Sequence, residues 1–397
     1  RIVADVARAQ NQKVLVAMGS ACETIEETID YLNARGEKGG LVKVRLYRPF
    51  PASELVAALP QTTRSIAVLD RTKEPGAAGE PLFADVMIAV AENAGHFATG
   101  MPKVIGGRYG LSSKEFTPAM AAAIFAELTR QAPKPRFTVG INDDVTHLSL
   151  PIPDDFEVAS DALTAVFYGL GSDGTVGAAK NTVKIIGSDE GRHAQGYFVY
   201  DSRKSGATTV SHLRFGDHPI KSAYLIDAAD FVAVHQFELL SQMRTLDIAK
   251  PGAVVLLNSP HGPGTWDELP VEVQQLIIDR DLKVWVIDAA EVARQAGLGK
   301  RINTVMQPCF FYLSGVVPRE QALARIKASV EASYGRRGRT VVERNFAAID
   351  ASVSALTELQ IPAVADSVIH RMPPMPQSAP DFVKQVTAVM LRGEGDL

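Results

Sequence analysis

A glycine-rich turn after a short apolar run is the part of this sequence best suited to chemistry. The run Thr164–Tyr168 is typical of a buried strand, and it leads into Gly169-Leu170-Gly171-Ser172-Asp173-Gly174-Thr175-Val176-Gly177. Apolar residues then recur three and four positions apart as far as Ile186, which predicts a helix. The first N–H groups of a helix have no partner inside the helix, so a strand, a glycine turn and a helix together aim free amides at a phosphate. The sequence therefore predicts a site for a phosphate-bearing ligand.

Several groups in and after this turn suit an anion. The residues expected to form the backbone cradle are Gly171, Ser172, Gly174, Thr175 and Val176. Lys180 and Asn181, one turn further on, would add a charge and a donor. Asp173 would repel a phosphate unless its side chain turns away to cap the turn. The turn has no Walker lysine, and the alternative is a tight turn that needs glycine only for packing.

Two further loops carry polar groups at strand ends. The segment Tyr200–His212 contains Arg203, Lys204 and Ser205, which could neutralise or bind a second phosphate. The alternative for this segment is a solvated loop with a basic pair. Asn258-Ser259-Pro260 follows the apolar run Gly252–Leu257, and the carboxyl ends of parallel strands are where α/β proteins bind ligands.

Composition excludes several classes of protein. With 397 residues, 46% of them hydrophobic, the chain is too apolar to be disordered and long enough for two or three domains. Its net charge of −4 argues against a general nucleic-acid binder, and no apolar run is long enough to cross a membrane. Its two cysteines, Cys22 and Cys309, suit a reducing cytosol and cannot build an iron–sulfur cluster by themselves. Because the chain begins at Arg1 and ends after a Pro-rich stretch, we expect a piece of a longer cytoplasmic protein.

Strand-type and helix-type runs alternate along most of the chain, which predicts the α/β fold class. We expect two three-layer α/β domains with mostly parallel sheets, followed by a helical and then extended linker. The break at Gln131–Arg136 (QAPKPR) separates a first domain over 1–132 from a second over 137–333, and the linker would cover 334–397. Within these domains we expect, among other elements, a helix at Arg1–Gln10 and a strand at Ala223–Leu225. We also expect strands at Phe231–His235 and Lys283–Ile287 and a helix at Val271–Asp279.

Several stretches of the sequence resemble the middle of the single-chain pyruvate:ferredoxin (flavodoxin) oxidoreductases. In the second predicted domain they are Thr138–Thr146 (TVGINDDVT), Gly169–Lys180 (GLGSDGTVGAAK), Tyr200–Gly216 (YDSRKSGATTVSHLRFG) and Arg301–Gln307 (RINTVMQ). In the first they are Val16–Ala21 (VAMGSA), Lys43–Pro51 (KVRLYRPFP), Val68–Gly76 (VLDRTKEPG) and Gly106–Gly110 (GGRYG). Tyr334–Asp350 (YGRRGRTVVERNFAAID) resembles the basic segment that follows the family's third domain.

The resemblance implies that the chain holds a transketolase-C-like second domain, a gamma-type third domain and the start of a linker toward a ferredoxin domain. Whole enzymes of this family convert pyruvate and coenzyme A to acetyl-CoA and CO2 and reduce ferredoxin or flavodoxin. Thiamine diphosphate, Mg and 4Fe-4S clusters are then expected in other domains of the same polypeptide. This chain alone is expected to have no catalytic residue and no metal site, and to be inactive. The family further implies a cytoplasmic homodimer, with no nucleic-acid or membrane partner.

The resemblance also implies a task for the predicted phosphate site, which is the handling of coenzyme A. The glycine turn suits the diphosphate or the 3′-phosphate of this ligand, and Arg203 or Lys204 would meet the other group. One alternative is that both domains only dock the catalytic domains and form the dimer. Others are a related 2-oxoacid:ferredoxin oxidoreductase with another substrate, or a stand-alone nucleotide-binding or CoA-transferase-like protein.

Overall fold

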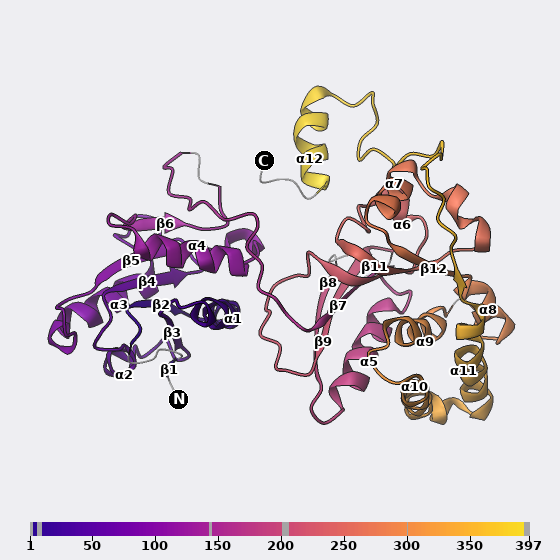
Figure 1. Cartoon of the computed structure of the whole chain (residues 1–397), viewed down its shortest axis with the longest axis horizontal. Coiled ribbons are helices and arrows are strands. Elements are labelled where there is room, and N and C mark those ends of the chain that lie inside the picture. Colours follow the sequence, from indigo (N-terminus) through magenta and orange to yellow (C-terminus); the bar gives the residue numbers. More distant parts are fainter. Residues whose placement is uncertain (1–2, 6–9, 143–144, 201–205, 300, 393–397) are drawn as a thin grey trace. The chain divides into compact units, whose positions relative to one another are not determined.

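The chain folds into two compact units, each with its own sheet (Figure 1). The computed structural model describes residues 3–5, 10–142, 145–200, 206–299 and 301–392. Within these ranges, the first unit comprises residues up to Ser160 together with Lys221–Tyr224, and the second comprises Asp161–Ile220 and the residues from Leu225 onward. The first unit thus extends beyond the break at Gln131–Arg136, because Arg136–Thr138 forms a strand of the first sheet.

The first unit is built on a sheet whose strands have the order β1-β3-β2-β4-β5-β6. All neighbouring strands are parallel except β1 and β3, which are antiparallel. Central strands are continuously apolar because helices cover both faces of the sheet. The strands are β1 (Val3–Asp5), β2 (Lys13–Ala17), β3 (Gly39–Val44), β4 (Ser65–Asp70), β5 (Lys103–Arg108) and β6 (Arg136–Thr138).

Helices form the two outer layers of the first unit. One face of the sheet is packed by α1 (Ala21–Ala34) and α4 (Pro118–Thr129), and the other by α2 (Ala52–Ala58) and α3 (Pro81–Glu92). Short 3-10 turns lie at Ala94–His96 and Leu111–Ser113. The Asp70 carboxylate, at the end of β4, accepts hydrogen bonds from the N–H groups of Leu82 (2.9 Å) and Phe83 (3.0 Å) and so caps α3.

The second unit is built on a sheet with the strand order β13-β12-β11-β10-β7-β9-β8. Strands β7, β10, β11 and β12 run parallel, whereas β8, β9 and β13 pair in antiparallel fashion toward the two edges. The strands are β7 (Leu163–Leu170), β8 (His193–Tyr200), β9 (Thr208–Gly216), β10 (Ala229–Val234), β11 (Ala249–Asn258), β12 (Lys283–Ile287) and β13 (Thr357–Glu358).

Helices also cover both faces of this sheet, so that it too forms the middle of three layers (Figure 1). One face carries α5 (Thr175–Gly187), α8 (Ala289–Gln295), α9 (Asn303–Ser314), α10 (Arg319–Tyr334) and α11 (Arg339–Ser352). The other carries α6 (Leu239–Gln242), the 3-10 segment Gly262–Glu268 and α7 (Val271–Asp279). Shorter 3-10 turns flank α11 at Gly335–Arg337 and Val353–Ala355.

The fold class expected from the sequence is confirmed, and two local expectations are wrong. Val3–Asp5 is a strand paired with β3, not part of a helix over Arg1–Gln10. Residues 223–225 form no strand. In the stretch 334–397, expected as a linker, α11 contributes Val342, Ala348 and Ile349 to the core and β13 adds to the edge of the sheet.

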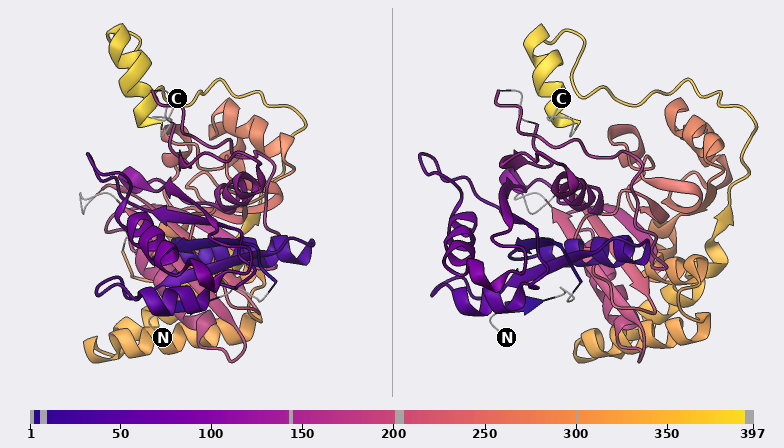
Figure 2. Two further views of the ribbon diagram at one scale, coloured as in Figure 1. Left: turned by 90° about the vertical axis from the view of Figure 1, so that its left-hand side faces the viewer. Right: turned by 60° about the vertical axis from the view of Figure 1, so that its left-hand side comes forward.

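Beyond β13 the chain is extended, as expected (Figure 2). The side-chain oxygen of Gln274 in α7 accepts hydrogen bonds from the N–H groups of Asp366 and Ser367, each at 3.0 Å. The Val271 N–H donates to the Ile369 carbonyl at 2.8 Å, which fixes the tail along the start of α7. The described chain ends with a π-helical turn at Val383–Thr387 and α12 (Ala388–Leu391).

Candidate anion-binding site at a glycine turn

The predicted glycine turn connects β7 to α5 at the carboxyl end of the second sheet. Ser172 and Gly174 have φ values of +78° and +93°, a left-handed conformation that is unstrained only for glycine. At Gly169 an added Cβ would lie 2.3 Å from the Thr175 hydroxyl oxygen, so a side chain there would displace the start of the helix. Glycine at 169 and 174 therefore lets the chain turn tightly into α5.

The Asp173 side chain caps the turn instead of facing an anion. One carboxylate oxygen accepts the Leu170 N–H at 2.7 Å, and the other accepts the Thr175 N–H at 2.8 Å. The Gln236 side-chain amide also donates to this carboxylate, at 3.1 Å. The Asp173 side chain therefore turns away from the open side of the turn, which is the arrangement that an anion at this turn requires.

The amides open to a ligand differ in part from those expected. The Gly171 N–H donates to the Ala207 carbonyl at 2.7 Å, and the Thr175 N–H is held by Asp173. Within the described part of the chain, no acceptor takes a hydrogen bond from the N–H groups of Val176 and Gly177, in the first turn of α5. Val176 and the exposed Gly177 therefore present the open donors, and Gly177 was not among the residues expected to do so.

The Thr175 hydroxyl faces inward to a buried histidine. Its oxygen lies 2.8 Å from Nδ1 of His235, which directly follows β10 and is 2% exposed. Burial lowers the pKa of His235 to about 4, so the ring is neutral near pH 7. Its other nitrogen, Nε2, has no hydrogen-bond partner among the described residues, and an edge-to-face contact with Phe167 fixes the ring.

A second helix begins beside the turn. A Cβ added to Gly174 would lie 2.9 Å from the side chain of Asn303, the first residue of α9. One turn later, the Gln307 amide donates to the Ala178 carbonyl at 3.3 Å and to the Thr182 hydroxyl at 2.9 Å. The two helices therefore run parallel with adjacent N-termini. Each such terminus carries a partial positive charge, so together they favour an anion.

The remaining predicted site residues of α5 have partners of their own. The Lys180 ammonium lies 5.2 Å from the centre of the Phe198 ring on β8. The Asn181 amide donates to Gln307 at 3.3 Å and accepts a hydrogen bond from Ser329 at 2.8 Å. Both polar atoms of Asn181 thus join α5 to α9 and α10.

The second predicted loop returns to the glycine turn. Arg203, Lys204 and Ser205 lie outside the described residues. Just after them, the Gly206 N–H donates to the Gly171 carbonyl at 3.3 Å, next to the Gly171–Ala207 hydrogen bond. The structure therefore brings two predicted features, separated in sequence by a helix and a strand, to one edge of the sheet.

The third predicted feature is internal. The Asn258 amide donates to the His235 carbonyl at 2.9 Å and accepts the Ala289 N–H at 3.0 Å, which ties β10 and β11 to the start of α8. The Ser259 hydroxyl lies 2.7 Å from that of Thr265 and is fully buried. These groups brace the edge of the sheet.

Sequence reasoning did not single out Gly177, His235 or Asn303 as parts of this site. Gly177 and Asn303 both lie in stretches that carry the family resemblance, and His235 ends a predicted strand at the ligand-binding edge. These sequence features could have identified the three residues as candidates. The contact between residues 174 and 303 could not be predicted from them, because it depends on the packing of α9 against α5.

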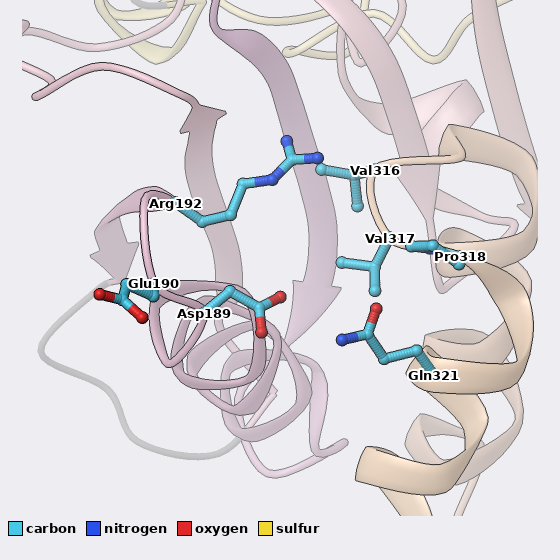
Figure 3. A pocket seen from close by; sticks show the side chains of 7 residues that line it. All are labelled: Asp189, Glu190, Arg192, Val316, Val317, Pro318 and Gln321. Atoms are coloured by element: carbon cyan, nitrogen blue, oxygen red, sulfur yellow. The ribbon is translucent and has the colours of Figure 1, made fainter.

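A hollow of about 200 Å³ lies at the opposite end of α5 (Figure 3). It is lined by Asp189, Glu190 and Arg192 from the turn before β8, by Val316, Val317 and Pro318 from the α9–α10 connection, and by Gln321 from the first turn of α10. Asp189 pairs with Arg325, and Arg192 with Asp217 at 3.0 Å. Because this hollow contains two carboxylates and none of the predicted site residues, it does not extend the anion site.

The described residues do not fit a metal ion or an iron–sulfur cluster. They contain no group of three or more His, Cys, Asp or Glu side chains placed to hold a metal. Both cysteines are buried, and burial raises the pKa of Cys22 to about 11 and that of Cys309 even further. None of the described helices has the length and apolarity needed to span a bilayer.

Comparisons with known proteins agree with the resemblance seen in the sequence. The family model "Pyruvate ferredoxin/flavodoxin oxidoreductase" matches residues 164–355, and "Pyruvate:ferredoxin oxidoreductase core domain II" matches residues 11–112. The fold of the pyruvate oxidoreductase subunit PORC from Thermotoga maritima matches 51% of this chain and all of that subunit, with 19% identity and a TM-score of 0.40.

Curated relatives match almost the whole chain. A pyruvate-flavodoxin oxidoreductase from Rhodospirillum rubrum is 56% identical over 98% of this chain, and a pyruvate:ferredoxin oxidoreductase from Moorella thermoacetica is 46% identical over 97%. The chain spans about a third of the length of these relatives, 33% in both cases. With two family models matched in order and close relatives along its length, the chain belongs to the pyruvate ferredoxin/flavodoxin oxidoreductase family.

Proposed function

We propose that this chain is part of a cytoplasmic, homodimeric enzyme that oxidatively decarboxylates pyruvate with coenzyme A to acetyl-CoA and CO2. Electrons would pass through 4Fe-4S clusters to ferredoxin or flavodoxin. Thiamine diphosphate, Mg and the clusters would be held by other domains of the same polypeptide, since the described residues offer no metal site. In this proposal the second unit binds coenzyme A, and the chain alone is inactive.

The observation that carries the coenzyme A site is the pair of open amides at the start of α5. Val176 and Gly177 present N–H groups without an acceptor among the described residues, and Asp173 is turned into the loop. The N-terminus of α9 lies beside them through Asn303. Amides at helix N-termini bind phosphate groups, and coenzyme A carries a diphosphate and a 3′-phosphate.

His235 provides independent support for a ligand site in this place. The buried Nε2 of His235 has no partner among the described residues, and such an unpartnered group costs about 1–3 kcal/mol of stability. Here the ring bonds the first side chain of α5, and it thereby fixes the helix terminus that offers the amides.

The chemical contribution of this chain is then binding and positioning. When bound, coenzyme A supplies the thiol that accepts the acetyl group. Holding its phosphates at a fixed edge of the second sheet would place that thiol and remove much of the entropic cost of bringing two reactants together. A related 2-oxoacid as the substrate would leave this role unchanged.

Substitution of Gly174 by valine tests the coenzyme A site. A Cβ at Gly174 would meet Asn303, and a φ of +93° strains any L side chain by about 1–2 kcal/mol. We expect Gly174→Val to weaken coenzyme A binding at least tenfold, measured by calorimetric titration of both the 397-residue chain and the full-length enzyme. The matched control is Gly191→Val, which has a φ of +80°, has open space around it and lies at the far end of α5.

The outcomes distinguish the alternatives. Loss of binding in Gly174→Val with retention in Gly191→Val supports the site. Equal affinities in both variants and the parent would place coenzyme A elsewhere. Failure of the folded parent to bind in either form would favour the alternative that these units only dock the catalytic domains.

A further inference from the structure

Strand β8 runs alongside α5 in a regular register. At Gly187 an added Cβ would lie 3.4 Å from Ala194, and at Gly196 one would lie 3.1 Å from Val183. The next contact outward is that of Lys180 with the Phe198 ring. Each contact thus moves about one helix turn back along α5, about 5.4 Å, and two residues along β8, about 6.8 Å. The next step in this pattern places Tyr200 beside the first turn of α5.

The pairing of the strands places the Tyr200 side chain on the α5 face of the sheet. Tyr200 is opposite Thr209, which is opposite Gly169, and residues paired in this way point to the same face. Gly169 faces α5, because the Thr175 hydroxyl lies against it. Tyr200 therefore lies on the same face as Phe198, one alternation nearer the ligand-binding edge.

Tyr200 is an exposed aromatic residue beside open amides. It is 67% exposed, the most exposed aromatic side chain described in β8. The register places it nearest to the first turn of α5, where the N–H groups of Val176 and Gly177 have no acceptor among the described residues. Open amides at a helix terminus can bind a phosphate, and an aromatic ring beside them can stack on a planar base. Together they suit a ligand that contains both groups.

We propose that Tyr200 is the platform on which the adenine ring of coenzyme A stacks. This inference rests on the proposed coenzyme A site and deepens it. The diphosphate would lie at the Val176 and Gly177 amides, with the base over Tyr200 and the Lys180 ammonium one turn further along α5, beside Phe198. Stacking needs only an aromatic face, so the Tyr200 hydroxyl takes no part.

Three variants test the platform. Stacking of one base on an aromatic side chain contributes binding free energy that corresponds to about a tenfold change in affinity. We therefore expect Tyr200→Ala to lower coenzyme A affinity about tenfold. Tyr200→Phe keeps the aromatic face and should bind as the parent does. The matched control is Tyr197→Ala, because Tyr197 is 56% exposed on the same strand but points to the opposite face. Binding is measured by calorimetric titration of the full-length enzyme and of the 397-residue chain.

A second probe lacks the base. 4′-Phosphopantetheine lacks the 3′-phosphoadenylate part of coenzyme A and keeps one phosphate, so its affinity should be the same in the parent and in Tyr200→Ala. Equal coenzyme A affinity in the parent and in Tyr200→Ala would overturn the platform and leave the proposed site standing. An equal loss for both ligands would show that Tyr200 acts through the fold, which also overturns it. A parent that binds neither ligand would overturn the proposed function itself.

Discussion

At the scale of single residues, Asp173 shows how a carboxylate fits into an anion site. It accepts hydrogen bonds from Leu170 and Thr175 and from the Gln236 amide, so its lone pairs are directed into the turn. Its charge nevertheless remains near the open amides of Val176 and Gly177. Asp173 therefore stabilises the turn through its hydrogen bonds but weakens the binding of an anion through its charge.

Two substitutions of Asp173 separate these effects. Asp173→Ala removes both backbone caps and should lower the free energy of unfolding by about 1–2 kcal/mol. Asp173→Asn keeps one acceptor and removes the charge, so coenzyme A affinity at low salt should rise several-fold while stability still falls. The control is Asp217→Asn, the same charge change at the far end of α5. Weaker binding in Asp173→Asn would mean that the carboxylate itself is needed.

His235 makes stability depend on pH in a defined direction. Its pKa of about 4 in the folded protein lies below the ordinary value of 6.5, because burial disfavours the charged ring despite the nearby Asp173 carboxylate. Between these pH values the unfolded chain binds a proton that the folded chain does not. Stability is therefore fully present above pH 6.5 and falls as the pH is lowered toward 4, by roughly 3 kcal/mol for this residue.

Denaturant titrations at several pH values check this dependence. His212, whose pKa is also lowered to about 4, contributes a second decrease of the same sign. We expect His235→Asn to remove about half of the combined decrease between pH 6.5 and 4, and His235→Asn with His212→Asn to remove most of it. The same slope in the parent and in His235→Asn would contradict the assignment.

At the scale of elements, buried and periodic segments could be predicted from the sequence. The limits of β12 and α7 agree with the apolar run Lys283–Ile287 and the helical pattern Val271–Asp279. β1 was not predicted, because Val3–Asp5 becomes a strand only through pairing with β3, far along the chain. β9 was not predicted because it buries His212 and Arg214, whose polarity is typical of a loop.

Only the part of the candidate site formed by residues adjacent in sequence could be predicted. The glycine turn and the helix after it follow from the sequence pattern. The inward turn of the Thr175 hydroxyl depends on His235, and the neighbour of Gly174 comes from α9, which packs beside α5 only in the folded unit. Contacts between segments distant in sequence are not encoded in a residue pattern.

The cap of α3 supplies a prediction for the first unit. Asp70 is 2% exposed and accepts two N–H groups, so Asp70→Ala should lower the stability of this unit by about 2 kcal/mol. Hydrogen exchange should accelerate at amides of α3 and β4. The control is Glu54→Ala, which removes an exposed acidic side chain from the first turn of α2. Unchanged exchange in Asp70→Ala would contradict the capping role.

At the scale of the whole molecule, the two units match different family models, and the candidate site belongs to the second unit alone. Relatives are about three times as long, since the chain covers 33% of the first of them. The proposed function therefore assigns binding and positioning to this chain and the redox and decarboxylation chemistry to the remaining domains.

The chain passes between the units at 160–161, 220–221 and 224–225, because Lys221–Tyr224 belongs to the first unit. There the Lys221 ammonium pairs with Glu26 at 2.7 Å and Asp30 at 2.8 Å. While the first unit is folded, it divides the long connection between β9 and β10 into two short stretches. Melting the first unit would merge them into one longer loop, and each doubling of loop length costs about 0.6 kcal/mol of closure entropy. The first unit thus shortens a loop of the second and adds a small entropic stabilisation to the sheet that carries the anion site.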